Sequence, residues 1–229
     1  MLAGKVCVVT NGAKGIGRKI IEEYAREGCT IAYIDTDEVS GKRFRNFLWT
    51  DYGVDAFFFH GDICSDQDIE IFTGGIIGQY GKVDYLIHNT CVNQNSFKSQ
   101  KNNKDEVFRE AVGSTALHEL LHAFEGYWGP AASAVSIIRA EDADVRVMTQ
   151  ILAKQYAGTV RVNSVNPSPD KIGIQTKYVT ALDVSQTIFF LGDERADFIN
   201  GENLEADGSI LRMKLCKNAN GWSYIEGLL

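Results

Sequence analysis

The stretch that decides the fold lies near the start of the chain and reads Val9-Thr10-Asn11-Gly12-Ala13-Lys14-Gly15-Ile16-Gly17. It separates an apolar run, which predicts a strand, from a series of apolar residues at helical spacing. Glycines at such a turn let the backbone approach a pyrophosphate, and the free N–H groups at the start of the helix favour negative charge. This strand–loop–helix order predicts a phosphate-binding turn of the dinucleotide type.

An acidic residue extends the pattern. About twenty residues further on, the second predicted strand ends at Asp35, which is placed to accept hydrogen bonds from an adenosine ribose. A carboxylate at this position repels a 2′-phosphate. The sequence therefore favours NAD over NADP as the nucleotide.

Short apolar runs rich in β-branched and aromatic residues alternate with helical patterns along the whole chain. We predict seven strands: Val6–Val9, Thr30–Ile34, Ala56–His60, Tyr85–His88, Ser133–Ile138, Val160–Val165 and Asn203–Ala206. The first four runs are mostly continuous rather than alternating, which is typical of strands buried on both faces. The alternation predicts an α/β fold, a Rossmann-type doubly wound parallel sheet of seven strands with helices on both faces.

The composition indicates one acidic domain, 1–229. Its 229 residues, 45% of them hydrophobic, can bury roughly 70–75% of the unfolded surface. The net charge is −7, with no basic stretch, which argues against a nucleic-acid or anionic-membrane partner. No apolar run approaches the ~18 residues of a membrane helix, and the chain opens on a strand pattern without a signal peptide. Five scattered cysteines predict a reduced, cytoplasmic protein.

Several stretches, in order along nearly the whole chain, resemble the short-chain dehydrogenase/reductase family. The family's Thr-Gly-x-x-x-Gly-x-Gly loop matches 10–17, and its acidic residue after strand 2 matches Asp35. Its Asp–aliphatic pair, which meets the adenine, matches Asp62-Ile63, and 83–91 matches the strand that leads into Asn-Asn-Ala-Gly. The resemblance implies that a nicotinamide cofactor is bound by Gly12, Lys14, Gly15, Ile16, Gly17, Asp35, Asp62, Ile63 and Asn89.

The family's catalytic residues are missing from this chain. A Tyr-x-x-x-Lys pair performs the proton transfer in the family, and none of the nine tyrosines here is followed by a lysine four positions later. Aligning the fifth helix puts Ile138 and Asp142 at the tyrosine and lysine positions. Aligning the fifth strand instead puts Ile138 or Arg139 at the catalytic serine. Ala111 stands where the family has a relay asparagine.

Three departures also affect the cofactor site. Asn11 replaces the first loop glycine, although Asn tolerates left-handed backbone better than most residues. Thr90 and Cys91 replace the small Ala-Gly beside the nucleoside, and the lysine that holds the nicotinamide ribose is absent. Two interpretations stay open: the loop binds NAD, or it is retained for folding alone.

A motif of a different kind lies within the predicted fourth helix. His118-Glu119-Leu120-Leu121-His122 fits His-Glu-x-x-His, which puts two imidazoles on one helix face with Glu119 as a base and Glu141 as a third ligand. A pattern of three fixed positions also arises by chance. We therefore treat a zinc site at His118 and His122 as the minor alternative to a solvated or interface-lining helix.

The function predicted from these residues is that of a pseudoenzyme, a structural or regulatory subunit that pairs with an active NAD-dependent dehydrogenase. Members of the family assemble through helices four and five, which here correspond to 105–127 and 141–156, and through the C-terminal segment. The tail 210–229, with Trp222 and Tyr224, belongs to no strand–helix unit and is either frayed or a subunit contact. The alternative is an NAD(H)-dependent oxidoreductase that uses Tyr127, His88 or His118 as its acid.

Overall fold

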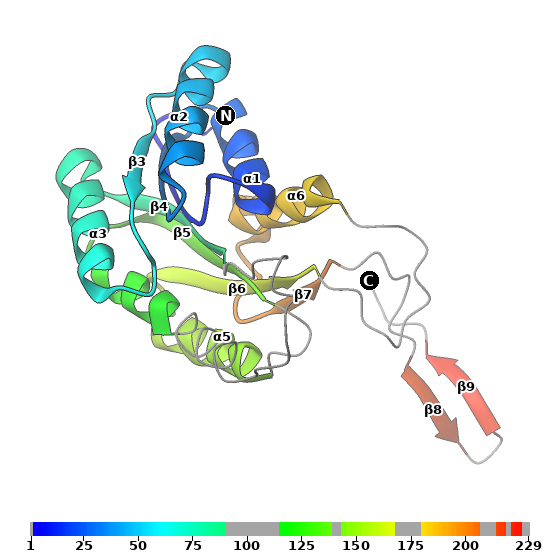
Figure 1. The fold of residues 1–229 in the computed structure, drawn as a ribbon. Coiled ribbons are helices and arrows are strands. Elements are labelled where there is room, and N and C mark those ends of the chain that lie inside the picture. The colour runs from blue at the N-terminus through cyan, green and yellow to red at the C-terminus, as the bar shows by residue number, and fades with distance from the viewer. Residues whose placement is uncertain are drawn as a thin grey trace, which may run out of the picture.

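A single parallel sheet organises the chain. The computed structural model describes residues 2–89, 115–138, 143–167 and 180–206, together with two short strands between 214 and 225. The main sheet has seven strands in the order β3-β2-β1-β4-β5-β6-β7, and every neighbouring pair is parallel. The strands are β1 (Val6–Thr10), β2 (Thr30–Asp35), β3 (Phe57–His60), β4 (Val83–Asn89), β5 (Trp128–Ile137), β6 (Val160–Asn166) and β7 (Asn203–Glu205) (Figure 1). The predicted doubly wound sheet is thus confirmed.

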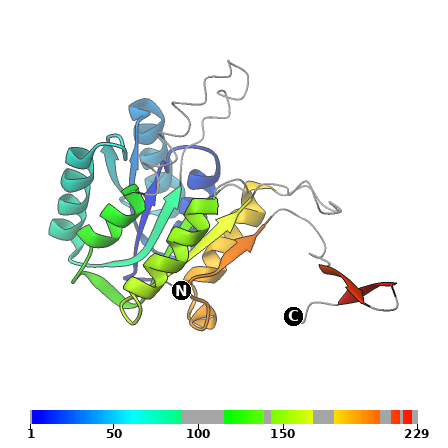
Figure 2. The same ribbon diagram turned by 90° about the horizontal axis from the view of Figure 1, so that it is seen from below.

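Helices cover both faces of this sheet, as Figure 2 shows from below. One face packs against α1 (Gly15–Arg26), α2 (Glu38–Tyr52) and α6 (Ala181–Gly192). The other packs against α3 (Asp66–Tyr80), a helical stretch at 115–123, and α5 (Ala143–Gln155). Each interface is a cluster of buried apolar side chains, with Tyr24 and Phe44 in the first and Phe72 and Leu120 in the second.

Polar residues set where most of the helices begin. Asp37 and Ser65 accept hydrogen bonds from the N–H groups of Ser40 and Asp68 at the starts of α2 and α3. Thr180 and Asp183 form a reciprocal capping box at the start of α6. The helix α1 differs, because Lys14 at its N-cap makes no side-chain capping bond and its first turn holds no acidic residue. No N-cap side chain therefore competes with a ligand for the N–H groups of its first turn.

The predicted helix 105–127 is too long at its C-terminal end. The helical stretch ends at 123, a turn follows at 124–126, and β5 begins at Trp128. Gly126 adopts φ 84°, a left-handed conformation that ends the helix without strain. The first residues of β5 escaped prediction because Gly129 and Pro130 are typical of a turn rather than a strand. Residues 105–114 lie outside the described part of the chain.

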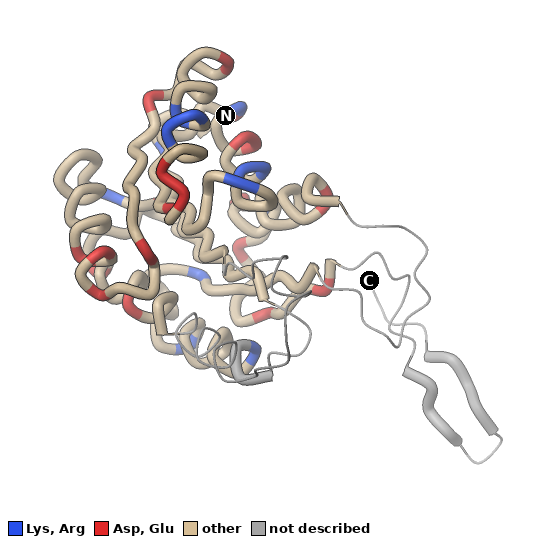
Figure 3. The backbone as a smooth tube through the Cα atoms, in the orientation of Figure 1, with Lys and Arg blue, Asp and Glu red and all other residues tan. Residues whose placement is uncertain are grey.

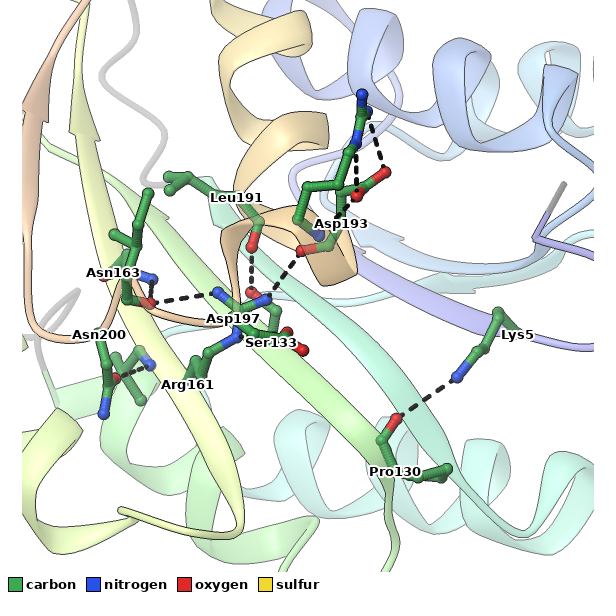
Figure 4. Close-up of polar contacts among 12 residues, drawn as sticks. Lys5, Pro130, Ser133, Arg161, Asn163, Leu191, Asp193, Asp197 and Asn200 are labelled. Atoms are coloured by element: carbon green, nitrogen blue, oxygen red, sulfur yellow. Dashed lines mark hydrogen bonds and ion pairs between the residues drawn. The ribbon is translucent and has the colours of Figure 1, made fainter.

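The amino ends of the strands are held together by a partly buried ion pair and by side-chain contacts to carbonyls. Lys5 binds Asp84 at 3.0 Å and the carbonyl of Pro130 at 3.4 Å. Arg161 on β6 donates to the carbonyl of Ile199 at 3.2 Å, beyond η2 (Glu194–Ala196). Figure 4 shows Lys5 beside Pro130, and, apart from them, Arg161 near Asp193 and Asp197 at the α6–η2 corner. They fix the end of the sheet opposite the glycine loop.

The C-terminal strands form a sheet of their own. β8 (Lys214–Asn218) pairs antiparallel with β9 (Gly221–Ile225), and neither joins the main sheet. This agrees with a tail that belongs to no strand–helix unit; its role as a subunit contact stays a prediction. Among the residues that the structure describes, no helix is long and apolar enough to cross a membrane.

Candidate nucleotide-binding edge

The predicted site residues gather where the strand order reverses. β1 lies between β2 and β4. The helices α1 and α2 cover one face of the sheet beside β1 and β2, and α3, which leads into β4, covers the other. In folds of this kind, ligands bind outside the carboxyl ends of the strands at such a point. Thr10 and Asn11 lie at the end of β1, Asp35 at the end of β2, and Asn89 at the end of β4. We refer to these three strand ends and the loop 11–17 as the nucleotide edge.

Asn11 and Asn89 bind each other's backbone across the nucleotide edge. The Asn11 amide donates to the Asn89 carbonyl at 2.7 Å, and the Asn89 amide donates to the Asn11 carbonyl at 3.0 Å. The Thr10 hydroxyl accepts from the Asn89 N–H at 2.9 Å. Asn11 holds φ 49°, so the residue that replaces the family's glycine does adopt the left-handed conformation. Its side chain adds an amide clamp that glycine lacks.

Two of the loop glycines are required by packing. A Cβ on Gly17 would lie 2.3 Å from the Asn11 carbonyl oxygen and 2.9 Å from the Asn89 amide. A Cβ on Gly12 would lie 2.6 Å from the side chain of Ile21. Gly15 is different, because a Cβ there would meet nothing within 4 Å, and its φ is 55°. Gly15 is needed for its backbone conformation, and the space beside it is open.

Asp35 holds the loop with its carboxylate. Its Oδ2 accepts from the Ala13 N–H at 2.9 Å, and its Oδ1 accepts from the Asp37 N–H at 2.9 Å, while the residue is only 8% exposed. Each carboxylate oxygen has a second lone pair, so ribose hydroxyls can still donate to it. Asp35 therefore fits the predicted role and also orders the loop.

An ion pair that the sequence reading missed spans the nucleotide edge. The Lys14 ammonium binds the Asp37 carboxylate, so the cation at the start of α1 meets the N-cap of α2. This bond and those from Ser40 lower the pKa of Asp37 to about 2. The sequence does show an aspartate directly before a helical pattern. This predicts that Asp37 is an N-cap, but it does not predict that Lys14 binds it.

Asp62 and Ile63 follow β3 as predicted. The Asp62 carboxylate accepts from the Cys64 N–H at 2.9 Å, and its own N–H donates to Asp68 at 2.8 Å. Asp62 is exposed, whereas Ile63 is 8% exposed and packs in the core. The pair is thus held in a tight turn beside the nucleotide edge.

The residue that the sequence alignments place at a catalytic position is apolar. Ile138 directly follows β5 and is 1% exposed. Ser133 is committed to the fold, because its hydroxyl donates to the Leu191 carbonyl at 3.0 Å. Ser136 is 1% exposed, and its hydroxyl has no hydrogen-bond partner. The remaining positions of interest, Thr90, Cys91, Ala111, Arg139 and Asp142, lie outside the described residues.

The three alternative acids lie far apart in the fold. His88 ends β4 beside the nucleotide edge, is 1% exposed, and has Nδ1 3.3 Å from the Thr10 hydroxyl. Tyr127 precedes β5 at the opposite end of the sheet and is 41% exposed. His118 lies on the outer helix 115–123 with its side chain 42% exposed. Of the three, His88 alone lies beside the nucleotide edge.

His118 and His122 share a helix face, as the motif predicts. Their rings are nearly parallel, with centroids 6.5 Å apart. His122 Nδ1 lies 3.2 Å from Glu125, and His118 Nδ1 lies 3.6 Å from Glu119. Within the described ranges, no group of three His, Cys, Asp or Glu residues could hold a metal ion, and Glu141 lies outside them.

Comparison with known proteins agrees with this architecture. A family model described as short chain dehydrogenase matches residues 5–121. Xanthoxin dehydrogenase of Arabidopsis thaliana is 24% identical over 259 aligned positions, which cover 90% of this chain and 90% of that protein.

Two solved structures share the fold. A blue fluorescent protein from a metagenomic library, in complex with NADPH, superposes with a TM-score of 0.77 at 21% identity, covering 91% of this chain and 98% of that one. A 3-ketoacyl-(acyl-carrier-protein) reductase from Brucella melitensis, complexed with NADH, gives a TM-score of 0.75 at 19% identity, with coverages of 91% and 98%.

The two kinds of glycine give a first prediction. We expect Gly17→Ala to lower the free energy of unfolding by about 1–3 kcal/mol, because the new methyl group meets rigid backbone. Gly74→Ala, on the exposed face of α3 with nothing within 4 Å of a Cβ, should raise it by about 0.5–1 kcal/mol through helix propensity. Urea unfolding measures both; equal effects of the two substitutions would contradict the packing argument.

The Lys14–Asp37 ion pair gives a second prediction. The folded pKa of Asp37, about 2, lies below the ordinary value of 3.8 for an aspartate. Its charge therefore stabilises the fold above pH 3.8, and this contribution is lost as the pH falls toward 2. Asp37→Asn keeps an N-cap acceptor but removes the charge. We expect this variant to be less stable than wild type at pH 7 and 5, and the difference to shrink at pH 3 in urea titrations. A difference that stays constant down to pH 3 would mean that the charge contributes nothing.

Proposed function

The chain belongs to the short-chain dehydrogenase/reductase family, and we propose that within it the protein is a non-catalytic, NAD-binding member that pairs with a homologous subunit. One observation carries the proposal: the full sequence has no Tyr-x-x-x-Lys pair, and the position after β5 is filled by the buried side chain of Ile138. Proton transfer needs a group within hydrogen-bond reach and of matched pKa. Isoleucine provides neither.

The nucleotide edge supports the binding half of the proposal. The start of α1 has no capping side chain, so its N–H groups and positive dipole end are available to a pyrophosphate. Gly15, Ile16 and Gly17 would supply these N–H groups, and Asp35 would accept from the adenosine ribose. Lys14, Gly12, Asn89 and the pair Asp62–Ile63 frame the same edge. The relatives that were solved with NADH and NADPH carry their nucleotides on this fold.

The outer face of α5 supports the pairing half. Val147 and Ile151 lie one helical turn apart and are 55% and 52% exposed. Two branched apolar side chains on one solvent-facing stripe are typical of a covered surface. The occupant we propose is a homologous subunit, seated on 141–156 and 105–127.

A second candidate function rests on His88. Its place at the end of β4, in contact with Thr10, would let a member without the tyrosine use an imidazole as its acid. Its burial counts against this role, because a proton donor must reach the reacting atom. Measuring turnover separates the two functions.

Nucleotide titration tests the proposed function. We expect the purified full chain to bind NADH more tightly than NADPH in a calorimetric titration, and to transfer no hydride between the nucleotide and a panel of aldehydes, ketones and alcohols. Asp35→Asn should weaken NADH binding about tenfold or more, because a charged hydrogen bond contributes ~1.5–3 kcal/mol. Asp51→Asn, an exposed carboxylate on α2, is the matched control and should leave the affinity unchanged.

Each negative result has a distinct meaning in this experiment. Absence of NADH binding would reject the binding half and leave the loop as a folding element. Turnover by the isolated chain would reject the non-catalytic half, and its loss in His88→Asn would establish the second candidate.

Subunit pairing is tested by charge insertion. We expect Val147→Glu and Ile151→Glu to dissociate the native assembly in light scattering, because each buries a carboxylate at the interface. Val39→Glu, on the solvent face of α2 with its valine 61% exposed, should leave the assembly intact. A native protein that is monomeric when purified from its own cells, or an assembly that withstands both α5 substitutions, would contradict the proposal.

A further inference from the structure

An arginine lies at the carboxyl ends of β6 and β7, on the same edge of the sheet as the nucleotide edge but beyond it. Arg146 belongs to the first turn of α5, and its Nη2 donates to the Glu205 carboxylate at 2.7 Å. The second oxygen of Glu205 accepts from the Asn166 amide, also at 2.7 Å. Glu205 is the last residue of β7 and Asn166 the last of β6. The guanidinium is therefore held at the carboxyl ends of β6 and β7.

The direction of α5 explains how the side chain reaches this edge. In a parallel β5–α5–β6 crossover the helix runs antiparallel to the strands, so α5 begins at their carboxyl ends. Figure 1 shows α5 alongside β6. Helical side chains lean toward the helix N-terminus, which brings the Arg146 guanidinium toward the same edge as the glycine loop.

One donor of Arg146 is unused. A guanidinium carries five N–H groups, and Nε of Arg146 is buried without a hydrogen-bond partner. The side chain as a whole is 27% exposed. A cation in the first turn of a helix lies at the positive end of the helix dipole, and the Glu205 carboxylate offsets this unfavourable placement. Arg146 thus combines an unpartnered donor and a positive charge with partial exposure, at an edge where ligands of this fold bind.

We propose that Arg146 binds an oxyanion, the carboxylate or phosphate group of a ligand that lies beside the nucleotide edge. The inference extends the proposed function, because it places a second, anionic ligand on the half of the edge that has lost the catalytic residues. Glu205 competes with this anion for the guanidinium. A planar guanidinium can bind either a carboxylate or a phosphate through two N–H groups at once, which a lysine cannot do.

Opposite effects of two substitutions test this proposal. The probes are succinate and inorganic phosphate, each titrated into the full chain at constant ionic strength, with and without NADH. We expect Glu205→Gln to bind the preferred probe several-fold more tightly than wild type, because it removes the competing charge. Arg146→Gln should abolish binding, and Arg146→Lys should weaken it. Comparing the two probes shows whether the ligand group is a carboxylate or a phosphate.

Controls separate this site from general charge effects. Arg195 and Asp193 form an exposed ion pair on the η2 corner at 2.8 Å, and Asp193→Asn and Arg195→Gln should leave anion binding unchanged. Arg146→Gln leaves Glu205 without its cation, so the double variant Arg146→Gln/Glu205→Gln, which removes both charges, serves as the folded non-binder, checked by circular dichroism.

Two outcomes would overturn the proposal: a wild-type chain and Glu205→Gln variant that bind neither probe, or an Arg146→Gln variant that binds like wild type. These results are independent of the nucleotide. A chain that binds NADH but no anion refutes this inference alone, whereas one that binds the anion but not NADH refutes the nucleotide proposal and leaves Arg146 as the anion site.

Discussion

The close approach of α1 to the ends of β1 and β4 is the contact on which the rest of the nucleotide edge depends. It requires a residue without a Cβ at Gly17, since any side chain there would collide with the Asn11 carbonyl. With α1 in this place, Asn11 and Asn89 exchange amide hydrogen bonds, and the Ala13 N–H reaches Asp35. The edge is therefore assembled from hydrogen bonds between the backbone and the side chains of Asn11, Asn89 and Asp35, which do not involve the family's catalytic positions.

This distinction explains how a chain without a Tyr-x-x-x-Lys pair can keep a phosphate loop. Gly12 and Gly17 are required for packing whether or not a nucleotide binds, so their presence alone is weak evidence for binding. The uncapped start of α1 and the open space beside Gly15 have no such packing reason. The case for a nucleotide rests on these two features and on Asp35, rather than on the number of glycines.

The sheet was predictable from sequence because its strands carry their signal locally. Continuous apolar runs such as Val6–Val9 and Thr30–Ile34 mark strands buried on both faces, and the structure extends each by a single residue. The start of β5 was harder to predict, because Gly129 and Pro130 are typical of a turn. Ala131 also takes φ 59°, a conformation that is rare for residues with a side chain. Local patterns do not describe a strand that bends in this way.

The ion pairs could not be predicted from the sequence, for another reason. Lys14 and Asp37 are 23 residues apart, and Arg146 and Glu205 are 59 apart. Taken alone, each of these residues looks like any of the charged residues that are spread over the described part of the chain (Figure 3). Only the crossover topology brings the partners together. The acids considered in place of tyrosine differ in this respect, because the predicted parallel strands already place His88 at a carboxyl end and Tyr127 before an amino end. The sequence did not show that His88 is buried, at 1% exposed.

α5 connects the two unusual features of this protein. Consecutive helical residues point about 100° apart, so Arg146 turns to the carboxyl edge while Val147 turns to the solvent. A subunit seated on Val147 and Ile151 would rest on the same turn of helix that carries the guanidinium. Burial of that turn would exclude water around the Arg146–Glu205 pair and strengthen every electrostatic contact there. In the function proposed above, α5 therefore has a positional role, in which subunit pairing and the charge at the sheet edge act on one element.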